Sequence, residues 1–370
     1  MTTIFITIPW FHPAFKAGGP VQSIANMVNE LKEGYQFYIF CGNTDLHGLP
    51  IAISNTNEWV HYNSHTKVWY ARKEHRSQQL EQQVKRIKPD ILYMVGLFSW
   101  TFTMVPLLFT NTPQKILSVR GMLHPGALGQ KSWKKKLYIR FLKQTGRHKR
   151  CIFQASDNTE AGFIKAIMGE GVAVKVAGNF PKLHGALPLP VKQTNELILI
   201  SIALISPMKN TLLILQALAN CTANIHYHIC GPVKEMNYWE ECLAAINLLP
   251  PNIKVTYHKE LPPAQVPDML QQAHVTIIPS KSENFGHSII EALSAGQPVI
   301  TSEYTPWNQL QPASAGLNVA TNQEALATGI EFFAAMDNST YHHWRQGALQ
   351  YAASQLDTAP LKLAYGELFG

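Results

Sequence analysis

The feature that most limits the fold is a strand–loop–helix–strand pattern between residues 275 and 301. Val275 to Ile278 is a short β-branched run, which predicts a buried strand, and residues 298–301 form a second apolar run. Between them a polar loop leads to Gly286, and residues 288–295 have the pattern of a helix that ends at a glycine. Two buried strands joined by a helix make a βαβ unit of a parallel sheet, so the pattern predicts an α/β fold.

The loop of this unit carries the polar groups of a candidate ligand site. It follows the carboxyl end of a strand, where open α/β sheets bind ligands, and the backbone N–H groups near residues 285–288 suit a phosphate. Glu283 and Glu291 flank these amides, eight positions apart. A carboxylate beside an anion is unfavourable unless it accepts hydrogen bonds from hydroxyls, so the pattern predicts a nucleotide-sugar site. The alternative interpretation is a surface glutamate and a solvated helix glutamate.

A longer pattern around the two glutamates resembles that of a known family. Glu283-Asn284-Phe285-Gly286, then Glu291-Ala292-Leu293 and AGQPVI at residues 295–300, is similar to the E-x7-E signature of retaining glycosyltransferases. These enzymes form the large group 1 family, also called family four. The resemblance implies the GT-B fold, in which two Rossmann-like domains face each other across a cleft. It is strong from about residue 197 to residue 319.

The resemblance implies a donor site in this second half of the chain. Glu291 would bind the ribose hydroxyls, and Glu283 would bind the hydroxyls of the donor sugar. Leu261 follows the strand predicted at residues 253–257, where relatives hold the nucleobase through backbone groups. Four residues between the glutamates complete the implied donor site: Asn284, Phe285, Gly286 and His287.

Lys209 is the candidate phosphate cation. Ser206 is a predicted N-cap followed by a proline, so Lys209 falls in the first turn of a predicted helix. A cation there is unfavourable for the helix dipole and therefore indicates a bound anion. In the resembled family an arginine and a lysine in this region hold the donor diphosphate. Lys209 matches the lysine, whereas Ala203-Leu204 replaces Gly-Arg, so one of the two phosphate cations is missing.

Two places in the first half extend the implied site. Gly18 and Gly19 end a long loop before a predicted helix, similar to the family's N-terminal loop, whose glycine amides approach the donor. The alternative is an ordinary helix start. Arg120 follows the strand predicted at residues 115–119. Many relatives have a histidine there that reaches the donor sugar, so the resemblance implies that Arg120 meets a phosphate or a sugar.

The length of 370 residues suits two α/β domains. Residues 1–182 are predicted as an N-terminal Rossmann-like domain, on the acceptor side, completed by a C-terminal helix at about residues 355–370. Residues 183–195 are rich in Pro, Leu and Lys without a clear period, which predicts an interdomain linker. Residues 196–354 are predicted as the C-terminal Rossmann-like domain, on the donor side.

Composition and missing motifs exclude several other classes. With 46% hydrophobic and 15% charged residues, the chain is predicted to be globular. Its five cysteines form no C-x-x-C pair, and its start lacks the basic residues of a signal peptide, so a reducing cytoplasm is expected. No G-x-G-x-x-G turn follows the first predicted strand, which argues against NAD or FAD. The Asp-x-Asp pair with which GT-A enzymes hold a metal is also absent, so no cofactor and no metal are expected.

A basic stretch from Lys131 to Arg150 contains no acidic residue. Its aromatic and apolar residues among lysines predict an amphipathic helix. One interpretation is a solvated helix face, and another is contact with an anionic membrane surface, on the inner face of the cell membrane. Nucleic acid is the third, and is ranked last because no helix-turn-helix, RNP or zinc pattern accompanies the stretch.

These observations predict a retaining glycosyltransferase that moves a hexosyl or N-acetylhexosaminyl group from a nucleotide-diphospho-sugar. The expected acceptor is a hydroxyl of a glycan or lipid-linked saccharide in surface polysaccharide synthesis, and no nucleic-acid partner is expected. Glu283, Lys209 and Arg120 are the candidate catalytic residues. Two alternatives stay open: a GT-B sugar-nucleotide epimerase, and a non-catalytic partner subunit, which the leucine at position 204 suggests.

Overall fold

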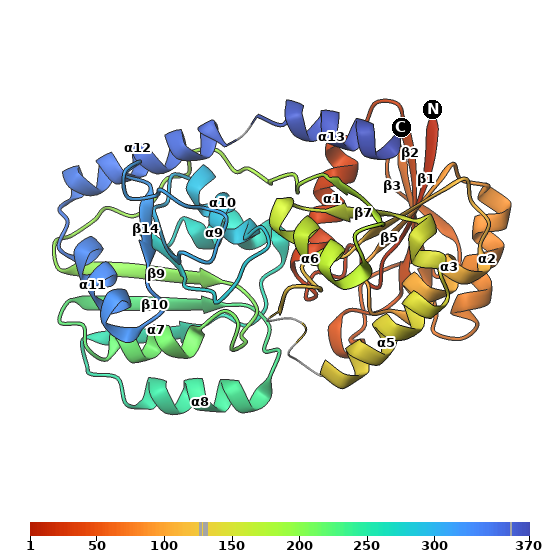
Figure 1. Cartoon of the computed structure of the whole chain (residues 1–370). Helices are drawn as coiled ribbons and strands as arrows, with labels where there is room; N and C mark the ends of the chain where they lie inside the picture. The colour runs from red at the N-terminus through yellow and green to blue at the C-terminus, as the bar shows by residue number, and fades with distance from the viewer. Residues whose placement is uncertain (126–127, 129–131, 356) are drawn as a thin grey trace. The chain divides into compact units, whose positions relative to one another are not determined.

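The computed structural model describes residues 1–125, 128, 132–355 and 357–370 (Figure 1). These residues divide into two units: Met1–Phe180 with Thr358–Gly370, and Pro181–Asp357. We call them unit 1 and unit 2. Each unit is a β-sheet of mainly parallel strands with helices on both faces, so the predicted α/β class is confirmed. Lys131 and Leu356, which belong to predicted segments, lie outside the described residues.

In the described part of unit 1, eight strands form one sheet in the order β3-β4-β2-β1-β5-β6-β7-β8. All pairs are parallel except β3 with β4, which is antiparallel. The central strand β1 is apolar and fully buried at Ile4–Ile6, as a strand covered on both faces must be. The strands are β1 (Thr2–Thr7), β2 (Tyr35–Gly42), β3 (Trp59–Asn63), β4 (Thr66–Ala71), β5 (Ile91–Val95), β6 (Gln114–Ser118), β7 (Ile152–Ala155) and β8 (Ala173–Val176).

Helices cover both faces of this sheet. One apolar core joins the sheet to α1 (Gly19–Glu30) and to α13 (Ala359–Phe369), whose Tyr365 ring stacks on Phe180 with centroids 5.3 Å apart. The other core joins the sheet to the remaining helices. These are α2 (Arg76–Ile87), a π-helix (Trp100–Met104), α3 (Val105–Phe109), α5 (Ser132–Gln144) and α6 (Asn158–Met168). Two short 3-10 helices lie at Leu46–Gly48 and Arg147–Arg150.

In the described residues of unit 2, six parallel strands have the order β11-β10-β9-β12-β13-β14. The predicted βαβ unit is present as β12, α10 and β13, with both strands fully buried. The strands are β9 (Glu196–Ile202), β10 (Asn224–Cys230), β11 (Ile253–Tyr257), β12 (Val275–Ile278), β13 (Val299–Ser302) and β14 (Gly316–Val319).

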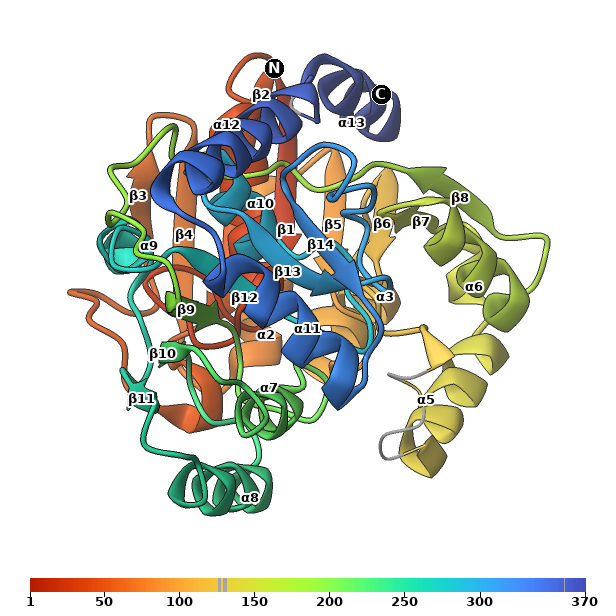
Figure 2. The same ribbon diagram turned by 90° about the vertical axis from the view of Figure 1, so that its left-hand side faces the viewer.

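Helices lie on both faces of this second sheet (Figure 2), and an apolar core lies on each face. Helices α7 (Thr211–Leu218), α8 (Met236–Asn247) and α11 (Gln323–Ala334) pack on one face. Helices α9 (Val266–Leu270), α10 (His287–Ser294) and the last turns of α12 (Asn338–Ser354) pack on the other, and a 3-10 helix lies at Pro263–Gln265.

Residues 183–195, which we predicted as an interdomain linker, are coil without strand or helix and are fixed on unit 2. The Leu187 N–H donates to the Ala295 carbonyl over 3.0 Å. Lys192 is buried, and its Nζ donates to the carbonyls of Ala334 and Met336 over 2.9 and 3.0 Å. This segment therefore belongs to the surface of unit 2, because its polar groups satisfy the ends of two helices.

No helix among the described residues combines the length and the apolar character needed to cross a bilayer.

Candidate functional site

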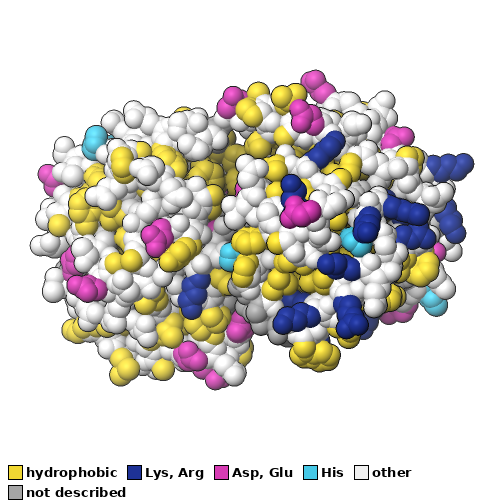
Figure 3. Space-filling view, in the orientation of Figure 1, with side chains coloured by type: hydrophobic (Ala, Val, Ile, Leu, Met, Phe, Trp, Pro, Cys, Tyr) yellow, Lys and Arg dark blue, Asp and Glu magenta, His cyan; other side chains and the backbone are white. Residues whose placement is uncertain are grey.

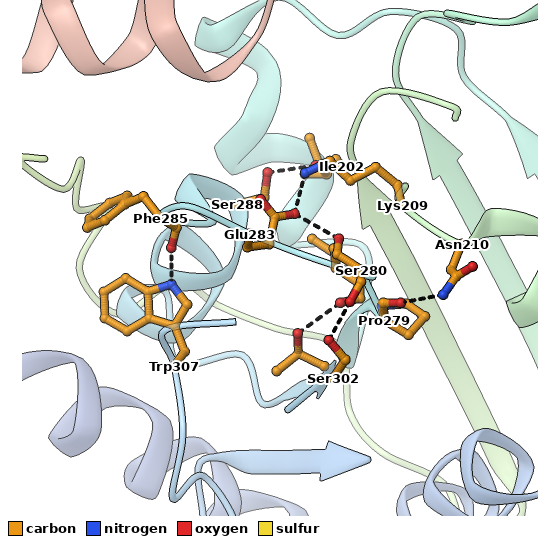
Figure 4. Close-up of polar contacts among 12 residues, drawn as sticks. Ile202, Lys209, Asn210, Pro279, Ser280, Glu283, Phe285, Ser288, Ser302 and Trp307 are labelled. Carbon is orange, nitrogen blue, oxygen red and sulfur yellow. Dashed lines mark hydrogen bonds and ion pairs between the residues drawn. The ribbon is translucent and has the colours of Figure 1, made fainter. Parts of the chain in front are cut away.

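Glu283 and Lys209 form an ion pair in unit 2 (Figure 4). Lys209 Nζ donates to Glu283 Oε1, and the Ser280 hydroxyl donates to the same oxygen over 2.7 Å. The side chains are only 10% exposed for Glu283 and 22% for Lys209. The structure therefore brings together the two residues that the resemblance assigns to the donor sugar and to the diphosphate, as partners of one ion pair.

The loop between β12 and α10 is tied to its neighbours through backbone bonds. The Lys281 N–H donates to the Met208 carbonyl over 2.9 Å, and the Glu283 N–H donates to the Tyr304 carbonyl over 3.1 Å. The Ser302 hydroxyl donates to the Ser280 carbonyl over 2.5 Å. These bonds fix the loop that carries Glu283 at the carboxyl end of the sheet, as predicted from the order of the elements.

The predicted helix start requires a glycine. Gly286 precedes α10 with φ +73°, a left-handed conformation that side chains disfavour. A Cβ atom there would also lie 3.0 Å from Ile289 Cδ1 and 3.3 Å from Trp307 Nε1. Trp307 Nε1 donates to the Phe285 carbonyl over 2.5 Å, so the indole holds this turn in place. The first backbone N–H groups of α10, which have no partner within the helix, therefore lie next to the loop that carries Glu283.

Glu291 lies one turn inside α10 and is 8% exposed. Within the described part of the chain, its carboxylate accepts no hydrogen bond, and the nearest ring nitrogen is His184 Nε2, 3.9 Å from Oε2. A buried carboxylate normally has several donors, so this one is poised for donors supplied by a ligand.

His184 is a site residue that our sequence analysis missed. It comes from the segment 183–195, and its side chain is 5% exposed. Its neighbours are set by tertiary packing, because the coil around it has no periodicity that could show which side chains turn inward.

The helix that follows Ser206 is present as α7, but our prediction of an N-cap at Ser206 was wrong. Ser206 lies in a turn, and α7 begins only at Thr211, after Asn210 with φ +60°. Asn210 Nδ2 donates to the Pro279 carbonyl over 2.9 Å, which holds this residue outside the helix. Lys209 therefore precedes the helix, and its N–H donates to the Ser206 carbonyl over 3.0 Å. The argument from an unfavourable helix dipole therefore does not apply to Lys209. Its place in the candidate site depends instead on its contact with Glu283.

The remaining predicted donor residues of unit 2 lie around this loop. The Phe285 and His287 rings are 4.7 Å apart, and Asn284 precedes them in the loop. Leu261 follows β11 and packs against the core that contains α10. The loop residues are half-buried, as groups at the mouth of a site should be.

Unit 1 contains the other three predicted residues, and they lie near one cavity. The cavity has a volume of about 480 Å³, and Arg120 lines it. Gly18 caps α1 with φ +74°, and Gly19 begins the helix, beside Ala17 and Pro20 of the cavity wall.

Arg120 is held inside unit 1. One guanidinium nitrogen donates to Asn179 Oδ1 and another to the Tyr93 hydroxyl over 2.9 Å. Burial acts to lower the Arg120 pKa, but Tyr93, Tyr365 and Glu160 outweigh burial and raise it, so the guanidinium stays charged. Two of its nitrogens are thus already used within unit 1, and Nε is buried without a hydrogen bond.

Among the described residues, no group of three or more His, Cys, Asp and Glu side chains lies where it could hold a metal ion.

Comparisons with known proteins agree with this architecture. Residues 190–351 match the model of the family described as glycosyl transferases group 1. Sucrose-phosphate synthase from Thermosynechococcus elongatus is similar over 100% of this chain and 98% of its own, with TM-score 0.73 and 16% identity. Anabaena HepE in complex with UDP-glucose is similar over 100% and 99%, with TM-score 0.70 and 15% identity. WaaG, a glycosyltransferase involved in lipopolysaccharide biosynthesis, is similar over 98% of each chain, with TM-score 0.66 and 14% identity.

A comparison with curated protein sequences gave no match. At identities of 14–16%, the likeness to these solved structures establishes the fold, and the family match establishes the kind of domain in unit 2. The predicted resemblance and the GT-B fold class are both confirmed: residues 190–351 match the model of the group 1 glycosyltransferase family, within a chain that has the two-domain fold of GT-B glycosyltransferases.

Proposed function

We propose that this glycosyltransferase transfers a hexosyl or N-acetylhexosaminyl group, with retention of anomeric configuration, from a nucleotide-diphospho-sugar. The observation that carries the proposal is the arrangement around α10. One buried carboxylate, Glu291, lacks donors, and a second, Glu283, is paired with Lys209 beside the start of the same helix. Hydroxyl groups of ribose and sugar would satisfy the carboxylates, and a diphosphate would meet the lysine and the helix amides.

In this reaction the bond between the anomeric carbon and the phosphate oxygen breaks, and the acceptor oxygen bonds to that carbon on the same face. The acceptor proton passes to the leaving phosphate. Negative charge builds on the diphosphate, and Lys209 and the backbone amides of Gly286 and His287 would stabilise it. We propose that no metal is needed, because these groups supply the charge stabilisation that a divalent cation supplies elsewhere.

The test is a panel of UDP-, GDP- and ADP-sugars, in which the release of nucleoside diphosphate is measured with and without saccharide acceptors. UDP-sugars come first, because the similar HepE structure contains UDP-glucose. Release that depends on acceptor, with retention by NMR of the product, supports the proposal. Interconversion of sugars without release would favour the epimerase, and binding without turnover would favour a partner subunit.

We propose that the acceptor binds in unit 1, at the cavity lined by Arg120. Its wall includes Trp10, which suits the flat apolar face of a sugar ring, and Arg76, whose Nη2 donates to the Ala71 carbonyl over 2.9 Å. Asp45, also in the wall, accepts from the N–H groups of Phe15 and Lys16 over 3.0 and 3.1 Å, which holds the loop before α1.

The surface of α5 supports a lipid-linked acceptor. Trp133, Leu137 and Phe141 are four residues apart, so they follow one helix face, and they are 66%, 61% and 42% exposed. Trp100 is 55% exposed and lies beside Phe141, with ring centroids 6.2 Å apart. We call these four residues the apolar ridge. The opposite face of α5 is buried in unit 1 through Ile139 and Leu142.

Basic residues flank the apolar ridge. In Figure 3, Lys and Arg side chains gather with apolar ones over α5. The exposed ones on this helix are Lys134, Lys136, Arg140 and Lys143. Tyr138 connects the helix to the cavity wall, since its hydroxyl donates to the Ser99 carbonyl over 3.1 Å. We propose that the ridge enters an anionic membrane on the cytoplasmic face, while the cations meet lipid headgroups.

The test of membrane contact is flotation with vesicles of phosphatidylglycerol and phosphatidylcholine. One variant replaces the four exposed cations of α5 with Gln, and a second replaces Trp133 and Leu137 with Ser. We expect the protein to float, both variants to lose flotation, and salt to weaken it, since charges in 0.1 M salt are screened over about 10 Å. Equal flotation of the variants, or none by the wild type, would show that α5 is a solvated face.

A further inference from the structure

His184 is a buried polar side chain that the proposed reaction leaves unused. Its Nε2 is fully covered and has no hydrogen bond, and the nearest charged atom is Glu291 Oε2 at 3.9 Å. A hydrogen bond between these atoms needs about 2.7–3.2 Å, so the pair is about 1 Å too far apart. Leaving a buried nitrogen without a partner is unfavourable, and its position beside the carboxylate therefore needs a reason.

The helix that carries Glu291 also fixes His184. The His184 N–H donates to the Ser294 hydroxyl over 3.2 Å, and that hydroxyl donates to the Glu291 carbonyl over 2.8 Å. The Leu187 N–H then donates to the Ala295 carbonyl over 3.0 Å. The coil that carries His184 is thus bound to the last turn of α10 at two points, so imidazole and carboxylate are held at a set separation.

The carboxylate of Glu291 has capacity for this contact. It offers about four acceptor positions, and none is used by the described residues. Its side chain is 11% exposed, so a ligand can approach one side while His184 lies on the other. A rotation of the carboxylate that brings Oε2 about 1 Å closer to Nε2 would complete the bond, and polar contacts in ligand-free sites commonly tighten in this way when the ligand binds.

We propose that His184 is a positioning residue for nucleotide binding, which donates from Nε2 to Glu291 Oε2 and so orients the carboxylate for the ribose hydroxyls. The inference rests on the proposed function, because it gives Glu291 the ribose. The imidazole itself does not touch the nucleotide. Its effect is to hold the Glu291 carboxylate in the orientation that the ribose hydroxyls require. Nucleotide binding then loses less conformational entropy in ordering this side chain.

The test measures UDP binding by calorimetry, without acceptor, for substitutions at position 184. We expect His184→Leu to raise the Kd about tenfold, the loss of one charge-assisted bond. His184→Gln, whose terminal amide can reach as far as Nε2, should stay within about threefold of the wild type. His184→Asn, whose amide ends near the Nδ1 position, should resemble the leucine variant. His342→Leu, at an exposed position of α12, is the matched control and should change nothing.

The decisive comparison is a cycle with Glu291→Ala. If His184 acts through Glu291, His184→Leu should change the Kd less than twofold once Glu291 is absent. An equal effect in both backgrounds, or no effect of His184→Leu in the wild type, would overturn the inference. The glutamine and asparagine variants keep the test valid if the leucine variant unfolds. Failure of wild-type protein to bind UDP, GDP or ADP would instead refute the proposed function, so the two failures are distinguishable.

Discussion

Replacing Lys209 with Met separates the catalytic role of this cation from its structural one. The substitution removes the charge that we assign to the leaving diphosphate, and it also removes the partner of Glu283. A single variant cannot tell the two losses apart. The double variant Lys209→Met, Glu283→Gln can, when it is compared with Glu283→Gln alone, because the amide keeps the shape of the carboxylate without leaving an unpaired charge on a side chain that is 10% exposed.

The magnitudes follow from the burial of the pair. Two unit charges about 4 Å apart interact by about 4 kcal/mol at an effective dielectric constant of about 20. If about half a unit of charge develops on the leaving phosphate, Lys209→Met raises the barrier by about 2 kcal/mol, which lowers turnover about thirtyfold. Breaking the ion pair should also reduce the free energy of unfolding by about 2 kcal/mol, between the values for exposed and fully buried pairs.

The assay compares nucleoside diphosphate release with unfolding in urea for both variants, for Glu283→Gln alone and for Lys209→Arg. We expect the double variant to recover the free energy of unfolding but to turn over about thirtyfold more slowly than Glu283→Gln alone, and Lys209→Arg to keep most of both properties. Turnover within threefold of the wild type in Lys209→Met would refute the assignment. So would a double variant that turns over as fast as Glu283→Gln alone, since the effect of Lys209→Met would then be structural.

Further expectations concern the two glutamates, metal and pH. Glu291→Ala should weaken nucleotide binding in calorimetry, and Glu283→Ala should lower turnover more than nucleotide affinity; activity within about twofold of the wild type in both would contradict the site. EDTA should leave activity intact, and inactivation that magnesium or manganese reverses would contradict the role given to Lys209. Burial lowers the pKa of His274 from 6.5 to about 4. Below about pH 6 this imidazole is therefore protonated in the unfolded state but still neutral in the native state. The free energy of unfolding in urea should therefore fall by up to about 1.4 kcal/mol per pH unit between pH 6 and pH 4 on account of this residue, and an unchanged slope in His274→Asn would contradict the assignment.

The parts of the fold that the sequence predicted are those whose signals are local. The strands and helix between residues 275 and 301 follow from apolar runs and from Gly286, whose left-handed φ is a property of that one position. Glu283 and Glu291 follow from their spacing around that helix start. The strands, the helix start and the spacing of the two glutamates can be predicted without knowing which residues pack against them, so the amino-acid order alone shows them.

The errors and omissions depend on contacts between distant segments. The capping pattern at Ser206 was overridden because Asn210 binds the Pro279 carbonyl and begins α7 later. Hydrogen bonds to the ends of α10 and α11 fix the segment 183–195 on unit 2 and bring His184 to Glu291, and the sequence of this segment has no period that could show them. Similarly, the sequence predicted that Arg120 follows a strand, but it did not predict the hydrogen bonds of Arg120 to Tyr93 and Asn179.

The pairing of Lys209 with Glu283 has a consequence for the order of events in the site. A lysine held by a carboxylate offers little net charge to a diphosphate, and the leucine at position 204 leaves no second cation where the resembled family has one. Donor binding should therefore exchange partners, so that Lys209 turns to the phosphates while Glu283 turns to the sugar hydroxyls. UDP carries the phosphates but not the donor sugar, so it gains nothing from Glu283 and must compete with it for Lys209. We accordingly expect Glu283→Gln to bind UDP several-fold more tightly than the wild type while turnover with a UDP-sugar falls. Weaker UDP binding in Glu283→Gln would show that the carboxylate orients Lys209 for the phosphates rather than competing with them.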